Sequence, residues 1–236
     1  MKIESSVSLV LAGYNEERQV EKAIQEAISV LSENFTKWEL ILIDDGSNDH
    51  TGEIMRKYAD NRNVFELPNI VNLNFGTAVL RGLYAARQKY VIYNAIDMPL
   101  KLTEIPVLIH EMENESLDCM ILERVGYNPT WWRKITSIGN TLLLRILYPK
   151  LTQGTPVLNF IQIYKTSILK EIIPLARGPI FVWPEMIFRV KLKGFCWKNR
   201  KVNCYVDSRR KGAFGKPHDI IWGIYEMLRF RFRKHK

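Results

Sequence analysis

Three groups of acidic side chains are the residues of this chain whose types and spacing could do chemistry. Glu16 lies in the run Tyr14-Asn15-Glu16-Glu17, Asp45 is the second acid of Asp44-Asp45-Gly46, and Asp97 comes further along. Carboxylates gathered in one crevice repel one another unless a cation or hydrogen-bond donors lie between them. A base and ribose supply such donors, and a divalent cation can bridge the phosphates. If the three groups meet, they predict a nucleotide site.

The elements that would position these acids alternate along the first half of the chain. Short apolar runs predict strands over residues 7–12, 38–43, 64–67 and 90–93. Apolar residues at helical spacing predict helices over 17–31, from the Ser47-Asn48-Asp49 cap to Tyr58, and over 76–83. This alternation is typical of βαβ units with a mainly parallel sheet, whose ligands bind beyond the carboxyl ends of the strands. The three acidic groups follow the first, second and fourth predicted strands, so we expect them to share that edge.

The charge of the chain is concentrated in its last quarter. The 236 residues carry 34 Lys and Arg against 25 Asp and Glu, a net charge of +9. Residues 186–236 alone hold 15 cations and 3 anions, which is +12. A basic patch of this kind suits phosphates of nucleic acid, lipid headgroups or nucleotides, although a solvated surface explains it equally well.

Composition limits the class of protein. The chain is 47% apolar and 25% charged, an ordinary globular composition. It has no run of about 18–20 apolar residues, and its first residues lack the apolar core of a signal peptide. Its three cysteines are widely spaced, which argues against a disulfide framework or a zinc cluster. We expect a cytoplasmic protein, soluble or peripheral to a membrane.

Several segments, in order, resemble inverting family 2 glycosyltransferases of the GT-A fold, in the branch of the dolichyl- and polyprenyl-phosphate sugar synthases. The specific matches are SLVLAGYNEE (residues 8–17) and ELILIDDGSNDHT (39–51), followed by NLNFGTAVLRGLYAAR (72–87) and YVIYNAIDMPLKLTEIP (90–106). Weaker matches lie at 125–137, 159–165, 181–195 and 209–216. The resemblance implies an α/β GT-A domain over residues 1–215, a mixed, mainly parallel sheet flanked by helices, and a basic amphipathic extension over 216–236.

The resemblance also implies a role for each acidic group. Tyr14 and Glu16 would line the base and ribose, and Asp45 would accept a hydrogen bond from the ring N–H of the base. Asp97 stands where the family's metal-binding Asp-x-Asp motif ends, and would coordinate Mg²⁺ or Mn²⁺ on the diphosphate. Gly76 is a nucleotide-site candidate, but a tight turn before its helix explains it better.

The remaining candidates are on the acceptor side. Arg133 would meet an acceptor phosphate, and Arg209 would act with the basic loop that closes over the diphosphate. Lys211 and Lys216 lie in that same loop, the family's R-x-x-G segment. Glu185 is either an acceptor-side residue or a helix-start carboxylate after Pro184.

One position departs from the family. In Asn94-Ala95-Ile96-Asp97, Ala95 stands where the first acid of Asp-x-Asp is expected. A single carboxylate can still hold Mg²⁺ together with diphosphate oxygens and water. The loss also raises an alternative of another class, a non-catalytic subunit that binds a nucleotide-sugar.

The resemblance and the charge pattern together predict transfer of a hexose from a UDP- or GDP-sugar to a polyprenyl or dolichyl phosphate. A phosphate monoester ionises near pH 6 and needs positioning more than a general base. The alternative acceptor is a glycan hydroxyl in polysaccharide assembly, which requires a base, and Glu185 or Asp207 would be the candidates.

The C-terminal segment 219–234 mixes apolar, aromatic and basic residues. It could lie in a membrane interface or pack its apolar face on the domain. Trp131 and Trp132 could mark a membrane-facing edge, but packing under the sheet is the expectation. No nucleic-acid-binding motif accompanies the basic residues, and a homodimer is compatible with the sequence.

Overall fold

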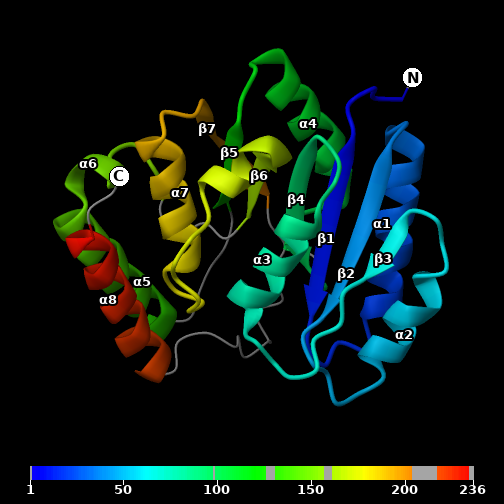
Figure 1. Ribbon diagram of the computed structural model, residues 1–236, viewed down its shortest axis with the longest axis horizontal. Coiled ribbons are helices and arrows are strands. Elements are labelled where there is room, and N and C mark those ends of the chain that lie inside the picture. The colour runs from blue at the N-terminus through cyan, green and yellow to red at the C-terminus, as the bar shows by residue number, and fades with distance from the viewer. Residues whose placement is uncertain (1, 98, 126–130, 157–160, 204–216, 234–236) are drawn as a thin grey trace.

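The chain folds around one seven-stranded sheet (Figure 1). The computed structural model describes residues 2–97, 99–125, 131–156, 161–203 and 217–233. The strands are β1 (Val7–Gly13), β2 (Trp38–Asp44), β3 (Val64–Glu66), β4 (Tyr90–Ala95), β5 (Cys119–Val125), β6 (Gln162–Lys165) and β7 (Trp197–Asn203). Their order across the sheet is β3-β2-β1-β4-β6-β5-β7. Strand β6 runs antiparallel to both of its neighbours, and the other pairs are parallel, so the predicted mixed and mainly parallel sheet is confirmed.

Helices cover both faces of the sheet. One face packs on α1 (Val20–Asn34), α2 (Thr51–Tyr58) and α4 (Ile105–Asn114), which the 3₁₀ turn η1 (Leu102–Glu104) precedes. The other packs on α3 (Phe75–Ala85), the 3₁₀ turn η2 (Thr166–Glu171) and α7 (Val182–Leu192). Outside α7 lie α5 (Trp131–Leu147), α6 (Pro149–Thr152) and α8 (Pro217–Phe232).

The elements predicted for the first half are confirmed, with small shifts at their ends. The first helix begins at Val20 rather than Glu17, because residues 16–19 form a turn in which the Glu16 carbonyl accepts from the N–H groups of Gln19 and Val20. Strand β3 ends one residue earlier than predicted, at Glu66.

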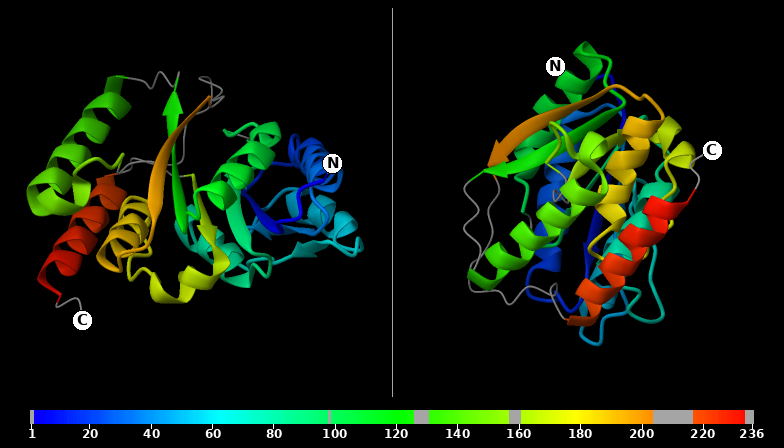
Figure 2. Two further views of the ribbon diagram at one scale, coloured as in Figure 1. Left: turned by 90° about the horizontal axis from the view of Figure 1, so that it is seen from above. Right: turned by 90° about the vertical axis from the view of Figure 1, so that its left-hand side faces the viewer.

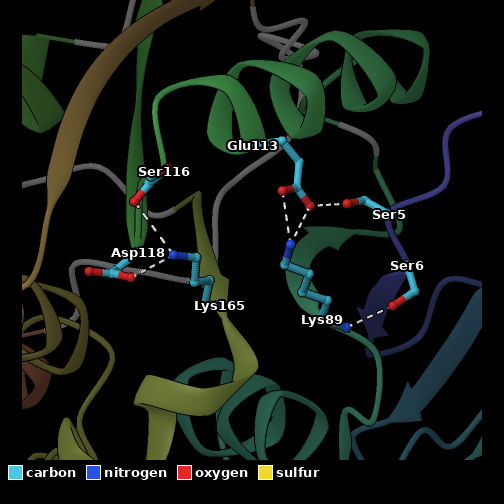
Figure 3. A network of polar contacts seen from close by, with 7 residues as sticks. All are labelled: Ser5, Ser6, Lys89, Glu113, Ser116, Asp118 and Lys165. Carbon is cyan, nitrogen blue, oxygen red and sulfur yellow. Dashed lines mark hydrogen bonds and ion pairs between the residues drawn. The ribbon is translucent and has the colours of Figure 1, made fainter.

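Ion pairs brace the edge of the sheet where β4 and β5 begin (Figure 3). Lys89, just before β4, contacts both carboxylate oxygens of Glu113 at 2.7 and 2.8 Å. Lys165, at the end of the antiparallel β6, contacts Asp118 at 2.8 Å. Ser5 also donates to Glu113. These contacts lie at the amino ends of the parallel strands, opposite the edge where the acidic groups were predicted.

The C-terminal segment forms a helix that packs on the rest of the chain. Met227 and Phe230 of α8 are buried in the same core cluster as α7. The proposed boundary at residue 216 falls just before α8, but the helix shares the core of the preceding domain. Among the described residues, no helix is both long and apolar enough to cross a bilayer.

Candidate functional site

The carboxyl ends of β2, β1 and β4 bring the three acidic groups to one edge. These strands are neighbours, with Gly13 of β1 in register with Asp44 of β2, and Ala12 of β1 in register with Ala95 of β4. The loops after β1 and β2 and the segment leading into α3 lie together along the lower edge of Figure 1. Tyr14, Glu16, Asp45 and Asp97 therefore follow adjacent strands at a common edge.

Hydrogen bonds join the loop after β1 to the loop after β2. The N–H of Asn15 donates to Ser47 Oγ at 2.9 Å, and the Asn15 side chain accepts from the N–H of Asn48 at 2.9 Å. The N–H of Glu16 donates to Thr51 Oγ1 at 2.8 Å. The Tyr14 hydroxyl lies 3.5 Å from Asn48 Nδ2, and the Tyr14 side chain stays exposed. These bonds fix the backbone that carries Tyr14 and Glu16 beside Asp45.

Asp45 is buried and fastens a third loop to the same edge. Its Oδ1 accepts from Asn69 Nδ2 at 2.7 Å and from the N–H of Leu73 at 2.9 Å. Burial raises the pKa of Asp45, although both hydrogen bonds and the nearby charge of Arg81 oppose the rise. The carboxylate is thus held in a dry, donor-rich setting suited to reading a polar ligand.

Gly46 allows this third loop to approach closely. Its φ is +75°, and a Cβ there would lie 2.6 Å from the Val71 carbonyl carbon. Only glycine fits both the left-handed conformation and the contact. The adjacent Asp44 accepts from the N–H of Ser47 at 3.0 Å and so stabilises the loop that follows β2.

Asp97 lies in the turn after β4, and its side chain is exposed. The turn packs closely on β1, since the N–H of Ile96 donates to the Ala12 carbonyl and a Cβ on Gly13 would lie 2.6 Å from Ile96 Cγ1. No cluster of three or more potential metal ligands occurs among the described residues. One exposed carboxylate on a fixed turn fits a cation such as Mg²⁺, which takes one or two protein carboxylates and completes its shell with substrate phosphates and water.

Gly76 is buried in the first turn of α3 rather than in a turn before the helix. Asn74 caps the helix by accepting from the N–H of Thr77 at 3.2 Å. A Cβ on Gly76 would lie 3.1 Å from Val182 Cγ1 and 3.6 Å from the Arg177 carbonyl oxygen. The glycine therefore allows α3 to pack closely on the start of α7 and on the segment before it.

Glu185 is buried in α7 and surrounded by donors. It accepts from the N–H groups of Leu175 and Ala176 at 2.9 and 2.8 Å, and from Arg189 Nε at 2.8 Å. These contacts make it a residue that shapes the chain between Leu175 and Arg177. That segment in turn contacts the start of α3, where Thr77 Oγ1 lies 3.5 Å from the Arg177 carbonyl.

The structure does not describe the side chains of the other candidates. Arg209, Lys211, Lys216 and Asp207 lie outside the described residues. Arg133 lies in the first turn of α5, and only its backbone is described.

Sequence reasoning missed the contribution of residues 69–74 to the site. Asn69 and Leu73 bind Asp45, and Arg81 braces their loop by donating to the Pro68 carbonyl at 3.2 Å. The signal was present as three asparagines in Asn69-Ile70-Val71-Asn72-Leu73-Asn74, a composition typical of a structured polar loop.

The expectation for Trp131 was wrong. Its side chain is 70% exposed at the start of α5 instead of being packed under the sheet.

Residues 8–173, more than half of the chain, match the glycosyl transferase family 2 domain. The chain belongs to this family. This family 2 chain is 29% identical over 157 residues to a dolichyl-phosphate beta-glucosyltransferase of Trichomonas vaginalis, across 59% of the chain and 48% of that protein. It is 31% identical over 170 residues to a dodecaprenyl-phosphate galacturonate synthase of Rhizobium johnstonii, across 70% and 49%. The chain spans about half the length of the curated relatives it matches.

Solved structures show the same fold. The glucosyl-3-phosphoglycerate synthase of Mycobacterium tuberculosis, crystallised with Mn²⁺, uridine diphosphate and phosphoglyceric acid, superposes with a TM-score of 0.71 at 18% identity. The superposition covers 98% of this family 2 chain and 80% of that protein. The predicted GT-A fold is confirmed.

Proposed function

We propose that this chain transfers a hexose, with inversion, from a UDP- or GDP-sugar to a polyprenyl or dolichyl phosphate. The observation that carries the proposal is the meeting of the Glu16, Asp45 and Asp97 loops at the ends of three adjacent strands in a family 2 domain. Support for the acceptor comes from relatives named as dolichyl- and polyprenyl-phosphate sugar transferases.

The donor would bind along this edge. Asp45 would accept from the base, while Tyr14 and Glu16 line the base and ribose. Asp97 would be the protein ligand of a Mg²⁺ or Mn²⁺ ion on the diphosphate, because Ala95 offers no carboxylate. When bound, the cation supplies positive charge to the leaving diphosphate. The fixed turn that carries Asp97 orients the diphosphate relative to Asp45.

The acceptor phosphate would be positioned by Arg133, Arg209, Lys211 and Lys216. It is ionised near neutral pH, so its oxygen can attack the anomeric carbon without a general base. Glu185 would act by shaping the 175–177 segment. A glycan hydroxyl acceptor is disfavoured because Glu185, one of the two base candidates, is buried among donors.

A lipid acceptor requires the domain to reach a bilayer surface, so we include peripheral membrane contact on the cytoplasmic side. The exposed Arg229 and Arg231 of α8 suit anionic headgroups.

The direct test is transfer by wild-type protein and Asp97→Ala across a panel of UDP- and GDP-sugars with Mn²⁺ and a short-chain isoprenyl phosphate. We expect wild-type transfer with one donor and a loss of about 10²-fold or more in Asp97→Ala, with unchanged circular dichroism. Asp60→Ala is the matched control, since it removes an exposed carboxylate from the loop before β3, at the opposite edge. Wild-type rates in Asp97→Ala would show that the metal site is misplaced.

Ala95 favours a second candidate, a non-catalytic subunit that binds a nucleotide-sugar. It predicts thermal stabilisation by one nucleotide-sugar without turnover of any donor in the panel. Metal-dependent transfer or hydrolysis of a donor would eliminate it.

A further inference from the structure

Helix α5 presents a stripe of large apolar side chains to the solvent. Among its residues, Trp131 is 70% exposed, Ile135 53%, Ile138 67%, Leu142 57% and Ile146 67%. The spacing of four, three, four and four residues places all five on one side of the helix. The stripe extends for most of a helix about 25 Å long. A contiguous apolar surface of this extent marks an interaction site.

Helix α8, which contacts α5, carries a second stripe of exposed apolar side chains. Ile221, Tyr225, Leu228 and Phe232 are exposed at spacings of four, three and four residues. They lie opposite the face that buries Met227 and Phe230 in the core. Figure 2 shows α5 and α8 side by side at one end of the molecule, where the two helices are in contact.

The charge around the α5 stripe is positive. Lys134 and Arg145 come directly before Ile135 and Ile146 of the stripe, and the sequence has no Asp or Glu between Glu123 and Glu171. Lys134 and Arg145 are exposed. A second copy of this surface would bring like charges together, so the stripe is a poor match for itself. Apolar side chains flanked by cations, with a tryptophan at one end, instead fit the interface of an anionic bilayer.

We propose that the α5 stripe is the membrane-docking surface of this domain, with its apolar side chains among the lipid headgroups and the neighbouring α8 stripe beside it. The inference deepens the proposed function, on which it rests for the presence of a lipid acceptor. It assigns the apolar contact to α5 and not to the C-terminal helix alone.

The test is flotation of the purified chain with vesicles of phosphatidylcholine, with and without phosphatidylglycerol. The test variant Ile138→Glu/Leu142→Glu places two charges on the stripe. The matched control Ser137→Glu/Thr141→Glu makes the same charge change at the same spacing, one residue earlier and off the stripe. We expect the test variant to lose vesicle binding by about tenfold or more. The control should lose less vesicle binding than the test variant. Its loss should fall mainly on binding to the vesicles that contain phosphatidylglycerol.

Both replaced stripe residues are exposed, so circular dichroism and the melting temperature should stay close to wild type. Equal flotation of wild type and the stripe variant would overturn the inference. So would a wild-type dimer that fails to float and that the stripe variant dissociates. Transfer to a water-soluble isoprenyl phosphate, measured on the same proteins, separates the two proposals. Stripe-dependent flotation without any transfer overturns only the function, and transfer without stripe-dependent flotation overturns only the docking surface.

Discussion

At the residue scale, Asp45 and Asp49 are two nearby aspartates on which the fold acts in opposite directions. Burial raises the pKa of Asp45. Burial acts in the same sense on Asp49, but hydrogen bonds from Thr51 and Glu17 outweigh it and lower the pKa of Asp49. Relative to the unfolded chain, folding therefore disfavours ionisation of Asp45 and favours ionisation of Asp49. Carboxylates whose pKa is shifted by burial are concentrated at functional sites.

Asp45→Asn should be at least as stable as wild type at neutral pH. The amide oxygen can still accept from Asn69 and Leu73, and the unfavourable buried charge is removed. Because the folded-state pKa of Asp45 is raised, its contribution to stability is present at low pH and is lost as the pH rises through that pKa. The melting temperature of wild type should therefore approach or pass that of the variant as the pH falls from about 7 to about 4.

Melting temperatures measured against pH, and their rise on adding a nucleotide-sugar, check this expectation. Asp49→Asn is the control with the opposite sign, less stable than wild type at neutral pH and converging with it in acid. Asp45→Asn should also lose stabilisation by the cognate nucleotide-sugar, since an amide in place of the second carboxylate oxygen donates where the base requires an acceptor. A variant that is less stable only at neutral pH would contradict the assignment for Asp45.

At the element scale, α3 lies close to the sheet because Gly82 has no side chain. A Cβ there would lie 2.4 Å from Val10 Cγ1 and 3.3 Å from Ile43 Cδ1. We expect Gly82→Ala to lower the free energy of unfolding by about 1–3 kcal/mol, measured by urea denaturation, since both neighbours are fully buried. Gly139→Ala in α5 is the control, because its Cβ would meet nothing within 4 Å. It should raise stability by about 0.5–1 kcal/mol. Equal effects would show that α3 can shift on the sheet.

The sequence predicted the elements of the first half because each strand and helix there has the periodicity of its own type. It predicted the shared edge because the acids follow strands. It could not predict that α5 leaves Trp131 exposed, since an apolar helix face looks the same whether a sheet or a lipid covers it. The role of Asn69 was also missed, because a long-range hydrogen bond leaves no periodic trace in the sequence.

At the scale of the whole molecule, Glu226 joins α8 to the domain. It is buried, and one oxygen accepts from the N–H groups of Arg177 and Gly178 at 2.7 and 3.0 Å. The same oxygen accepts from Trp222 Nε1 at 3.0 Å. Glu185 of α7 accepts from the preceding N–H groups, those of Leu175 and Ala176. The two glutamates, one from α7 and one from α8, thus bind the N–H groups of residues 175–178.

Glu226→Ala should destabilise the chain by about 1–3 kcal/mol, because it leaves those N–H groups without an acceptor. Hydrogen exchange in α8 should accelerate more than exchange in β1 and β2. Glu226→Gln retains an acceptor oxygen and should recover most of the loss. If the alanine and glutamine variants lost the same stability, the charge of Glu226 rather than its hydrogen bonds would account for its contribution.

The reversed direction of β6 has a consequence for where further ligand contacts can come from. Because β6 runs against β4, with Ile92 opposite Ile163, the chain enters β6 at the edge where β4 leaves the sheet. Residues at the start of an antiparallel strand thus become neighbours of residues that follow a parallel one. Ligand contacts can therefore come from residues that begin a strand, and mutational scans of this domain should cover Ile161 and Gln162 as fully as the turn at Asp97.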